Sequence, residues 1–496
     1  MTLDELEEKL SSYGAGGYYL LELFVTRLLE LEAAAHQQPM SVESRESDFS
    51  FDAFAPAGLG TLRGPLAIEI SHSLSERKFQ AVLKRSWERI RSDGLSLLLI
   101  SLRPPQSVYR VPTEFEIHNT GVHIWGPEKI QDLIDKYPEA AKSISEGLFS
   151  SRLKSTIDKK ADDWKTQREL LIGEVRSCYG SGRFSIWLGA GVSSSAGLPD
   201  WNTLLNSLFV SMLTEGEPVG DTAERGHISS IVDRLRQVDG PSSLMLARYI
   251  RKGLSIGSTK EQDHFTEAVT RQLYGLRNSN FALASPLITA LAAMCMPSRT
   301  GAKVRSVLTY NFDDLLERQL LGRGLQFRSI FEEIDLPSAE ELPVYHVHGF
   351  LPENRANYPN LNKSTLVFSE EGYHHIYRES YHWSNLIQLN NLKETTCVMV
   401  GLSLTDPNLR RLLEISAKNF DKPRHFAFLK RIGLDQFSKE GGKNVVDAPP
   451  EKVAMFLERH HNLNEEVMRE LGVNIIWYEN YDEIPMLLGE IQRVLT

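Results

Sequence analysis

Cysteine is scarce in this sequence. Only Cys178, Cys295 and Cys397 occur among 496 residues, and no two of them are close together. A disulfide framework needs paired cysteines, and a structural zinc site of the four-cysteine kind needs four of them. Both are excluded, and the reducing cytoplasm is the compartment that fits this cysteine content.

Long apolar runs and an excess of positive charge are also missing. No stretch reaches the roughly 18 consecutive apolar residues of a membrane-spanning helix, and the first residues are acidic where a secretory signal is basic. The formal net charge of −10 disfavours bulk binding to nucleic acid, which depends on many Lys and Arg contacts to phosphate. We therefore expect a soluble cytoplasmic protein that has no membrane partner.

The length predicts at least two domains, because one hydrophobic core rarely supports 496 residues. Residues 1–140 combine helical apolar spacing with short strand-like runs, which predicts a smaller α/β domain. The polar stretch 141–165 is interpreted as a linker. In 166–496 short apolar runs alternate with helical patterns, which predicts a Rossmann-like parallel sheet with helices on both faces. Within it, residues 205–300 are predicted to form a helical insertion.

Four predicted strands of the second domain end in glycine-rich or polar loops, which begin at Gly189, Thr309, His346 and Gly401. Glycine after a strand lets the backbone approach a diphosphate closely, with peptide N–H groups turned toward the negative charge. Open α/β sheets bind ligands at the carboxyl edge, next to the point where the strand order reverses. The four loops together therefore predict a nucleotide site at that edge.

These segments, in this order, resemble the sirtuin family, whose NAD⁺ site contains a Gly-Ala-Gly loop, an Asn-x-Asp segment, a His-Gly pair and a Gly-x-Ser loop. The resemblance covers about residues 165–496 and implies that NAD⁺ is the substrate. It implies that the diphosphate is bound by Gly189, Ala190, Gly191 and Ser193. Asn311 and Asp313 would contact nicotinamide and its ribose, and Gly401 and Ser403 would contact adenosine. His348 takes the position of the catalytic histidine.

The sequence departs from the protein-deacylating sirtuins. It cannot supply their four zinc-binding cysteines, Tyr310 replaces the glutamine that usually precedes Asn-x-Asp, and Trp201-Asn202 replaces a Phe-Arg pair. The closer resemblance is to prokaryotic sirtuin-like effectors of anti-phage defence, which lack the zinc module and destroy NAD⁺. It implies an NAD⁺ glycohydrolase of abortive infection that forms a homo-oligomer and answers to an activating protein or a phage-derived trigger.

Chemistry supports this interpretation. Cleavage of the nicotinamide–ribose bond passes through an oxocarbenium-like state, so the enzyme must hold both phosphates, orient the ribose and admit a water molecule. Asn311 is the candidate for orienting the ribose or the water. His348 is the candidate general base, since an unperturbed histidine pKa of about 6.5 leaves the ring largely neutral at pH 7. The product is either linear or cyclised ADP-ribose.

Two other functions stay open, namely a protein deacylase or ADP-ribosyltransferase, and a non-catalytic sensor of NAD⁺ or ADP-ribose. The missing cysteines disfavour the deacylase, and the pairing of Asn311 with His348 disfavours a sensor, which needs no base. No metal site is expected, because His346 and His348 would share one face of a strand but the sequence suggests no third ligand.

The first domain contains Asp52 and Glu69 on either side of a turn over 56–60. The order of helix, Asp-containing hairpin, Glu-containing strand and helix resembles the restriction-endonuclease fold, whose two carboxylates hold Mg²⁺. In that fold a lysine lies two positions after the glutamate, where this chain has Ser71. We therefore predict a degenerate copy used for binding or assembly. The helix after Ser75 carries basic residues that leave a nucleic-acid partner open beside a plain solvated face, namely Arg77, Lys78, Lys84, Arg85, Arg89 and Arg91.

Overall fold

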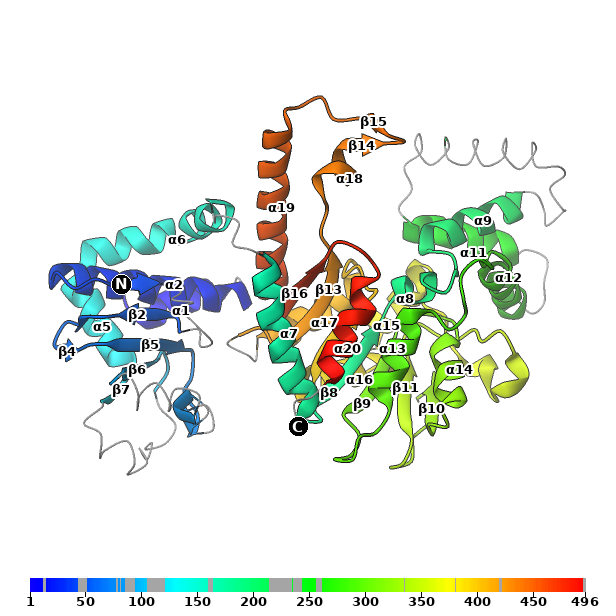
Figure 1. Ribbon diagram of the computed structural model, residues 1–496, viewed down its shortest axis with the longest axis horizontal. Coiled ribbons are helices and arrows are strands. Elements are labelled where there is room, and N and C mark those ends of the chain that lie inside the picture. The colour runs from blue at the N-terminus through cyan, green and yellow to red at the C-terminus, as the bar shows by residue number, and fades with distance from the viewer. Residues whose placement is uncertain are drawn as a thin grey trace. The chain divides into compact units, whose positions relative to one another are not determined.

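The computed structural model describes residues 1–11, 15–42, 51–76, 79–80, 82–84, 94–104, 121–158, 164–213, 234, 243–255, 261–333, 335–379, 381–418 and 422–493. The chain divides into two compact units (Figure 1). Unit 1 comprises Met1–Lys160 together with the short segment Ala417–Lys422, and unit 2 comprises Ala161–Ser416 and Pro423–Thr496.

Unit 1 is a small α/β unit built on a five-stranded mixed sheet. In spatial order its strands are β1 (Ser41–Val42), β2 (Ala53–Ala55), β5 (Leu66–Ser71), β6 (Ser96–Ser101) and β7 (Val122–Trp125). The first three run antiparallel, while β5, β6 and β7 run parallel. Every residue of β5 is buried, because this central strand has packed side chains on both faces of the sheet.

The helical residues Phe79, Val82 and Leu83 pack on one face of this sheet, and four described helices of unit 1 cover the other face. They are α1 (Leu3–Ser11), α2 (Ala15–Ala35), α5 (Pro127–Lys136) and α6 (Pro138–Asp158), and a small hairpin joins β3 (Gly58–Leu59) to β4 (Leu62–Arg63). Helix α6 covers most of the stretch that the sequence predicted as a linker. Its Ala141, Ile144 and Leu148 recur at helical spacing and pack into the core, so this polar stretch belongs to the fold of unit 1.

Of the basic residues predicted on the helix after Ser75, only Lys84 lies within the described residues, and its side chain is exposed. Arg77, Lys78, Arg85, Arg89 and Arg91 lie outside the described residues.

Unit 2 contains a seven-stranded, fully parallel sheet in the order β10-β11-β9-β8-β12-β13-β16. The strands are β8 (Phe184–Leu188), β9 (Val304–Thr309), β10 (Phe327–Ile330), β11 (Leu342–His346), β12 (Thr396–Val400), β13 (His425–Lys430) and β16 (Val473–Tyr478). Six of them overlap the apolar runs that predicted strands from the sequence, at 184–188, 304–308, 344–347, 395–400, 425–429 and 473–477, and β10 was not predicted. The predicted Rossmann-like α/β class is confirmed.

Helices cover both faces of this sheet (Figure 1). On one face lie α7 (Trp164–Gly180), α13 (Pro286–Cys295), α14 (Leu315–Gly322) and α20 (Glu483–Gln492), and on the other α16 (Trp383–Glu394), α17 (Pro407–Ala417) and α19 (Pro450–Glu470). Strand alternation explains this division, since Ile186 and Leu188 join the first core and Trp187 joins the second.

The remaining elements of unit 2 are short or belong to the predicted helical insertion. They are α8 (Ala190–Ser194), α9 (Trp201–Leu213), α11 (Ser243–Ser255), α12 (Glu261–Gly275), η1 (Arg355–Asn357), η2 (Leu361–Lys363), α15 (Glu370–Arg378), α18 (Leu434–Ser438) and the β14–β15 hairpin (Lys439–Glu440 and Lys443–Asn444). None of the helices in the described ranges is long and apolar enough to cross a membrane.

The strand order reverses beside β8. From this strand the chain adds β9 and β11 on one side, and later adds β12, β13 and β16 on the other. The carboxyl ends of β8 and β12 therefore flank the topological switch point, the place where sheets of this kind bind ligands.

Candidate functional site

Two glycine-containing loops meet at the switch point. The N–H of Gly189 donates to the carbonyl of Val400, and the N–H of Gly191 donates to the carbonyl of Gly401, both at 3.0 Å. A Cβ atom at position 189 would lie 2.5 Å from the Gly401 carbonyl oxygen, and one at position 191 would lie 2.9 Å from the Gly401 Cα. Glycine is therefore required for the close approach of the two loops.

This arrangement corrects one detail of the sequence interpretation. The N–H groups of Gly189 and Gly191 were expected to face a diphosphate, but they donate to the last residue of β12 and to the first residue of the loop that follows. The contribution of these two glycines in this structure is to let the loops pack closely. Ala190 lies between them at the start of α8 and is exposed.

A hydrogen-bond network joins the loops that follow β8 and β9. The Asn311 Nδ2 donates to the Gly189 carbonyl at 3.0 Å and to the Ser193 Oγ at 2.7 Å. The Ser193 hydroxyl donates in turn to the Asp313 Oδ2 at 2.5 Å. The Asp313 Oδ1 accepts the N–H of Leu315 at 3.1 Å, at the start of α14. Four residues predicted for the site are thus directly connected.

Asp313 is buried within this network. Burial raises the pKa of Asp313 above its ordinary value, although the hydrogen bond from Ser193 acts in the opposite direction. The carboxyl group therefore has polar partners on both oxygens, which offset part of the cost of burying it.

His348 follows β11 and lies in an aromatic environment. Its ring packs edge-on against Tyr310 at 4.7 Å and against Tyr373 of α15 at 5.9 Å between centroids. Only 8% of the residue is exposed, and its Nε2 is 3.7 Å from the Asp406 Oδ2, with no hydrogen-bond partner among the described residues. A buried nitrogen without a partner costs about 1–3 kcal/mol, and such groups commonly mark a functional site.

Burial also lowers the pKa of His348, and the nearby Asp406 carboxylate opposes this shift only in part. The ring is therefore neutral at pH 7 and can accept a proton. Asp406 is itself fixed, because its Oδ1 accepts the Leu409 N–H at 2.7 Å at the start of α17 and its Oδ2 accepts the Tyr373 hydroxyl.

Tyr310, Tyr373 and Asp406 were not predicted as parts of the site. Tyr310 directly precedes Asn311, and its hydroxyl donates to Gln388 of α16. Its position beside Asn-x-Asp and the position of Asp406 in the loop after β12 were the available signals. Tyr373 offered none, because only the folding of α15 brings it to His348.

His346 is the other histidine of this strand end, and it is fully engaged within the protein. Its Nε2 lies 2.6 Å from the Glu317 Oε1, and its Nδ1 lies 3.3 Å from the Asn311 carbonyl oxygen. Because both ring nitrogens have partners, the His346 side chain supports the backbone at Asn311.

Two features limit where a ligand would bind. The cavity lined by Ser193, Asn311 and Asp313, among others, has a volume of about 10 Å³, the lower limit for one water molecule. A dinucleotide would therefore lie on the loops outside this cavity. Ser403 is exposed, and its hydroxyl is 2.7 Å from that of Thr405, so within the described contacts it stays separate from the Asn311 network.

The carboxylate pair predicted in unit 1 is also present. Asp52 accepts the Ile70 N–H at 2.7 Å, and the Nζ of Lys422 lies 3.1 Å from the Asp52 Oδ1 and 2.8 Å from the Glu69 Oε1. Burial raises the pKa of Asp52, while Lys422 lowers it. Lys422 belongs to the segment Ala417–Lys422 of this unit, 353 positions after Glu69, so no local motif could reveal it.

A parallel sheet with helices on both faces and polar loops at its switch point gives unit 2 a Rossmann-like α/β fold. Residues 305–445 match the sequence model of the family described as SIR2-like domain. The matched stretch contains the Asn311, His348 and Gly401 loops and begins after the Gly189 loop. No curated protein matches the chain. The similarity to SIR2-like domains fits chemistry on NAD⁺.

Proposed function

We propose that unit 2 is an NAD⁺ glycohydrolase, which cleaves NAD⁺ to nicotinamide and ADP-ribose or a cyclised product. One observation carries this proposal. A buried, neutral His348 without a hydrogen-bond partner for its Nε2 in the described structure lies against Tyr310, the residue next to the Asn311 amide. Both loops follow neighbouring strands at the ligand-binding edge of the sheet.

The geometry suggests distinct roles for the two residues. The Asn311 Nδ2 is anchored by the Gly189 carbonyl and the Ser193 hydroxyl, which fixes the plane of the amide. Its Oδ1 is then the atom that accepts a hydrogen bond from a ribose hydroxyl or from the attacking water. His348 accepts the proton released when that hydroxyl or water reacts.

The surrounding residues complete the proposed substrate site. The nicotinamide–ribose bond breaks with positive charge developing on the ribose, and the carboxylate of Asp313 would stabilise that charge. The diphosphate would lie along the loop carrying Ala190 and Ser193, and the adenosine along the loop carrying Gly401 and Ser403. The resemblance to sirtuins and the SIR2-like match support this placement.

For the cellular role we propose an effector of anti-phage defence that depletes NAD⁺ in abortive infection. The resemblance to prokaryotic sirtuin-like effectors supports it. Such an effector acts as a homo-oligomer and is activated by a partner protein or a phage-derived trigger. For unit 1 we propose a role in binding or assembly, because the Lys422 ammonium group lies between the Asp52 and Glu69 carboxylates, where a nuclease of the restriction-endonuclease fold would hold Mg²⁺.

The test incubates the full chain with NAD⁺, with and without lysate from phage-infected cells, and analyses the products by mass spectrometry. Release of nicotinamide with ADP-ribose or its cyclic form is the expected result. His348→Ala should lower the rate of NAD⁺ cleavage at least about 100-fold, because a general base contributes at least that factor. His374→Ala is the matched control, since this exposed histidine lies on α15 outside the site. Equal turnover in both variants would show that His348 is not the base.

A further inference from the structure

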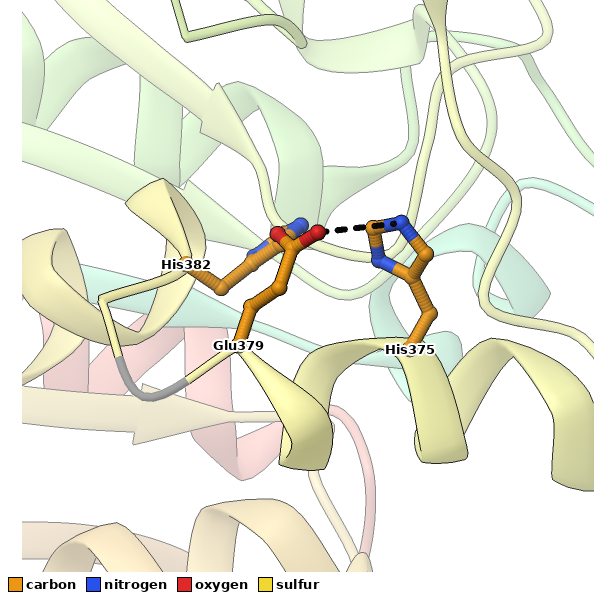
Figure 2. Close-up of side chains that lie close together, drawn as sticks. All are labelled: His375, Glu379 and His382. Atoms are coloured by element: carbon orange, nitrogen blue, oxygen red, sulfur yellow. Dashed lines mark ion pairs between the residues drawn. The ribbon is translucent and has the colours of Figure 1, made fainter.

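Three side chains that can bind metal gather where α15 ends and α16 begins, in unit 2 (Figure 2). His375 lies in the last turn of α15, Glu379 directly follows that helix, and His382 is the N-cap of α16. Their ligand atoms all lie within 4.8 Å of one another. Figure 2 shows the Glu379 carboxylate between the two imidazole rings.

The spacing of these atoms is close to that of a bound ion. Zinc–nitrogen and zinc–oxygen bonds of about 2.0–2.2 Å in tetrahedral geometry place ligand atoms about 3.4 Å apart. The His375 Nε2 and the Glu379 Oε1 are already 3.6 Å apart, and both side chains are about half exposed, at 51% and 57%. Small side-chain rotations would therefore bring the three atoms to bonding distance.

The His382 side chain is held in place by contacts with Ser384. Its Nδ1 lies 2.7 Å from the Ser384 hydroxyl, and its ring is nearly perpendicular to that of His375, with 5.5 Å between centroids. In the structure Nδ1 also accepts the Ser384 N–H at 3.4 Å, as the cap of α16. Binding of a metal ion through Nε2 would move the ring proton to Nδ1, where the Ser384 hydroxyl oxygen can accept it. A ligand histidine held through its other nitrogen in this way is the usual arrangement at metal sites.

A second carboxylate lies close to this cluster. Glu333, from the segment after β10, interacts electrostatically with His382. The alternative explanation is an ordinary helix-surface ion pair, which would explain why His375 and Glu379 lie close together and would stabilise the helix by only about 0.3–0.5 kcal/mol. Such a pair would not explain why His382, from the start of α16, lies beside them.

We propose that His375, Glu379 and His382 bind one divalent transition-metal ion, with zinc as the preferred ion and a water as fourth ligand. Two imidazoles and one carboxylate form a ligand set typical of zinc and unsuited to Mg²⁺ or Ca²⁺, which prefer oxygen ligands alone. No metal site was expected from the sequence, because it suggested no third ligand beside His346 and His348.

The proposed ion would brace the helix that lines the candidate site. Tyr373 lies two positions before His375 on α15, packs against His348 and donates to Asp406. Bridging the end of α15 to the start of α16 would fix the helix that carries Tyr373. The proposal concerns a structural or regulatory metal, and it does not depend on NAD⁺ hydrolysis.

The test uses the full chain freed of metal by a chelator. Zinc chloride is titrated calorimetrically, and Co²⁺ is added separately to record its visible spectrum. We expect one Zn²⁺ per chain and intense Co²⁺ bands of a tetrahedral site. His375→Ala and His382→Asn should each weaken Zn²⁺ binding at least about 100-fold, since even losing a partner of a ligand costs 10–100-fold. Asparagine keeps the capping function of position 382.

His374→Ala is the control, because this exposed histidine is adjacent to the cluster but not part of it. It should bind Zn²⁺ as the wild type does, and circular dichroism should show all variants folded. The proposal is overturned if the wild type takes up no stoichiometric Zn²⁺. It is equally overturned if His375→Ala and His382→Asn bind Zn²⁺ as tightly as the control does.

Discussion

Replacing Asn311 separates a structural role of its amide from a chemical one. Asn311→Ala removes the two hydrogen bonds that Nδ2 donates to the Gly189 carbonyl and the Ser193 hydroxyl, at 3.0 and 2.7 Å. Each such bond contributes about 1 kcal/mol net, so the free energy of unfolding should fall by about 2 kcal/mol. From a typical stability of at least about 5 kcal/mol, about 3 kcal/mol remains.

The remaining free energy of unfolding decides how a change in NAD⁺ turnover is interpreted. With about 3 kcal/mol left, fewer than about 1% of the molecules are unfolded, so lost stability alone would leave the NAD⁺ turnover almost unchanged. If Asn311 orients the ribose or the water, turnover should instead fall at least about 100-fold, as misplacement of a reacting group does. Asn311→Asp, which has the same shape but lacks the amide donors, should lose turnover as well.

The assay pairs urea denaturation with NAD⁺ turnover measured on the same preparations. The expected outcome is a midpoint shift that corresponds to about 2 kcal/mol, together with a much larger loss of turnover. If Asn311→Ala is destabilised as expected but its turnover stays within threefold of the wild type, the network is purely structural. The proposed role of Asn311 in the reaction would then be refuted.

Four further predictions concern other residues. First, kcat/KM for NAD⁺ should start to decline only below pH 6.5 as the pH is lowered, because burial lowers the pKa of His348. A decline with its midpoint at or above pH 6.5 would contradict the role of His348 as base. Second, an acetylated peptide should not be deacetylated with NAD⁺, and stoichiometric release of acetyl-ADP-ribose, followed by mass spectrometry, would disprove this. Third, His425 should contribute about 2 kcal/mol to the loss of stability between pH 7.5 and pH 5, because burial lowers the pKa of His425 to about 3 while the unfolded chain protonates near pH 6.5. His425→Asn should remove this part of the pH dependence in urea titrations. Fourth, the full chain should not cut DNA or RNA with Mg²⁺ or Mn²⁺ in a gel assay, because Lys422 contacts both the Asp52 and the Glu69 carboxylate. Cleavage that disappears in Asp52→Ala and Glu69→Ala would contradict this prediction.

The sign of the third prediction follows from the neutral state of the buried ring. His425 is 2% exposed, and its Nδ1 accepts the N–H of Cys397 at 3.2 Å. Because protonation is possible in the unfolded chain before it is possible in the folded one, its contribution to stability is complete above the unfolded pKa. That contribution is lost as the pH falls toward the folded value.

The sequence was sufficient for strands with continuous apolar runs and for loops with distinctive residues. It missed β10 because Arg328 and Ser329 interrupt the apolar pattern of this short edge strand. It placed a linker over α6 because the charged residues there obscured three apolar positions at helical spacing. Both errors arise where the hydrophobic signal is weak.

Within the candidate site, the sequence offered a local pattern for some residues and none for others. Asn311 and Asp313 belong to a short motif that directly follows a strand, and hydrogen bonds place both side chains beside Ser193. Tyr373 and Lys422 come from segments whose approach depends on tertiary packing. A single sequence contains no local pattern for such pairs.

The assignment of Ala417–Lys422 to unit 1 has a practical consequence. The chain passes between the two units three times, after Lys160, after Ser416 and after Lys422. A fragment that ends at residue 160 would therefore lack Lys422, whose Nζ lies 3.1 Å from the Asp52 Oδ1 and 2.8 Å from the Glu69 Oε1. Nuclease assays on such a fragment would test a carboxylate pair without its native lysine, so their outcome could not be transferred to the whole protein.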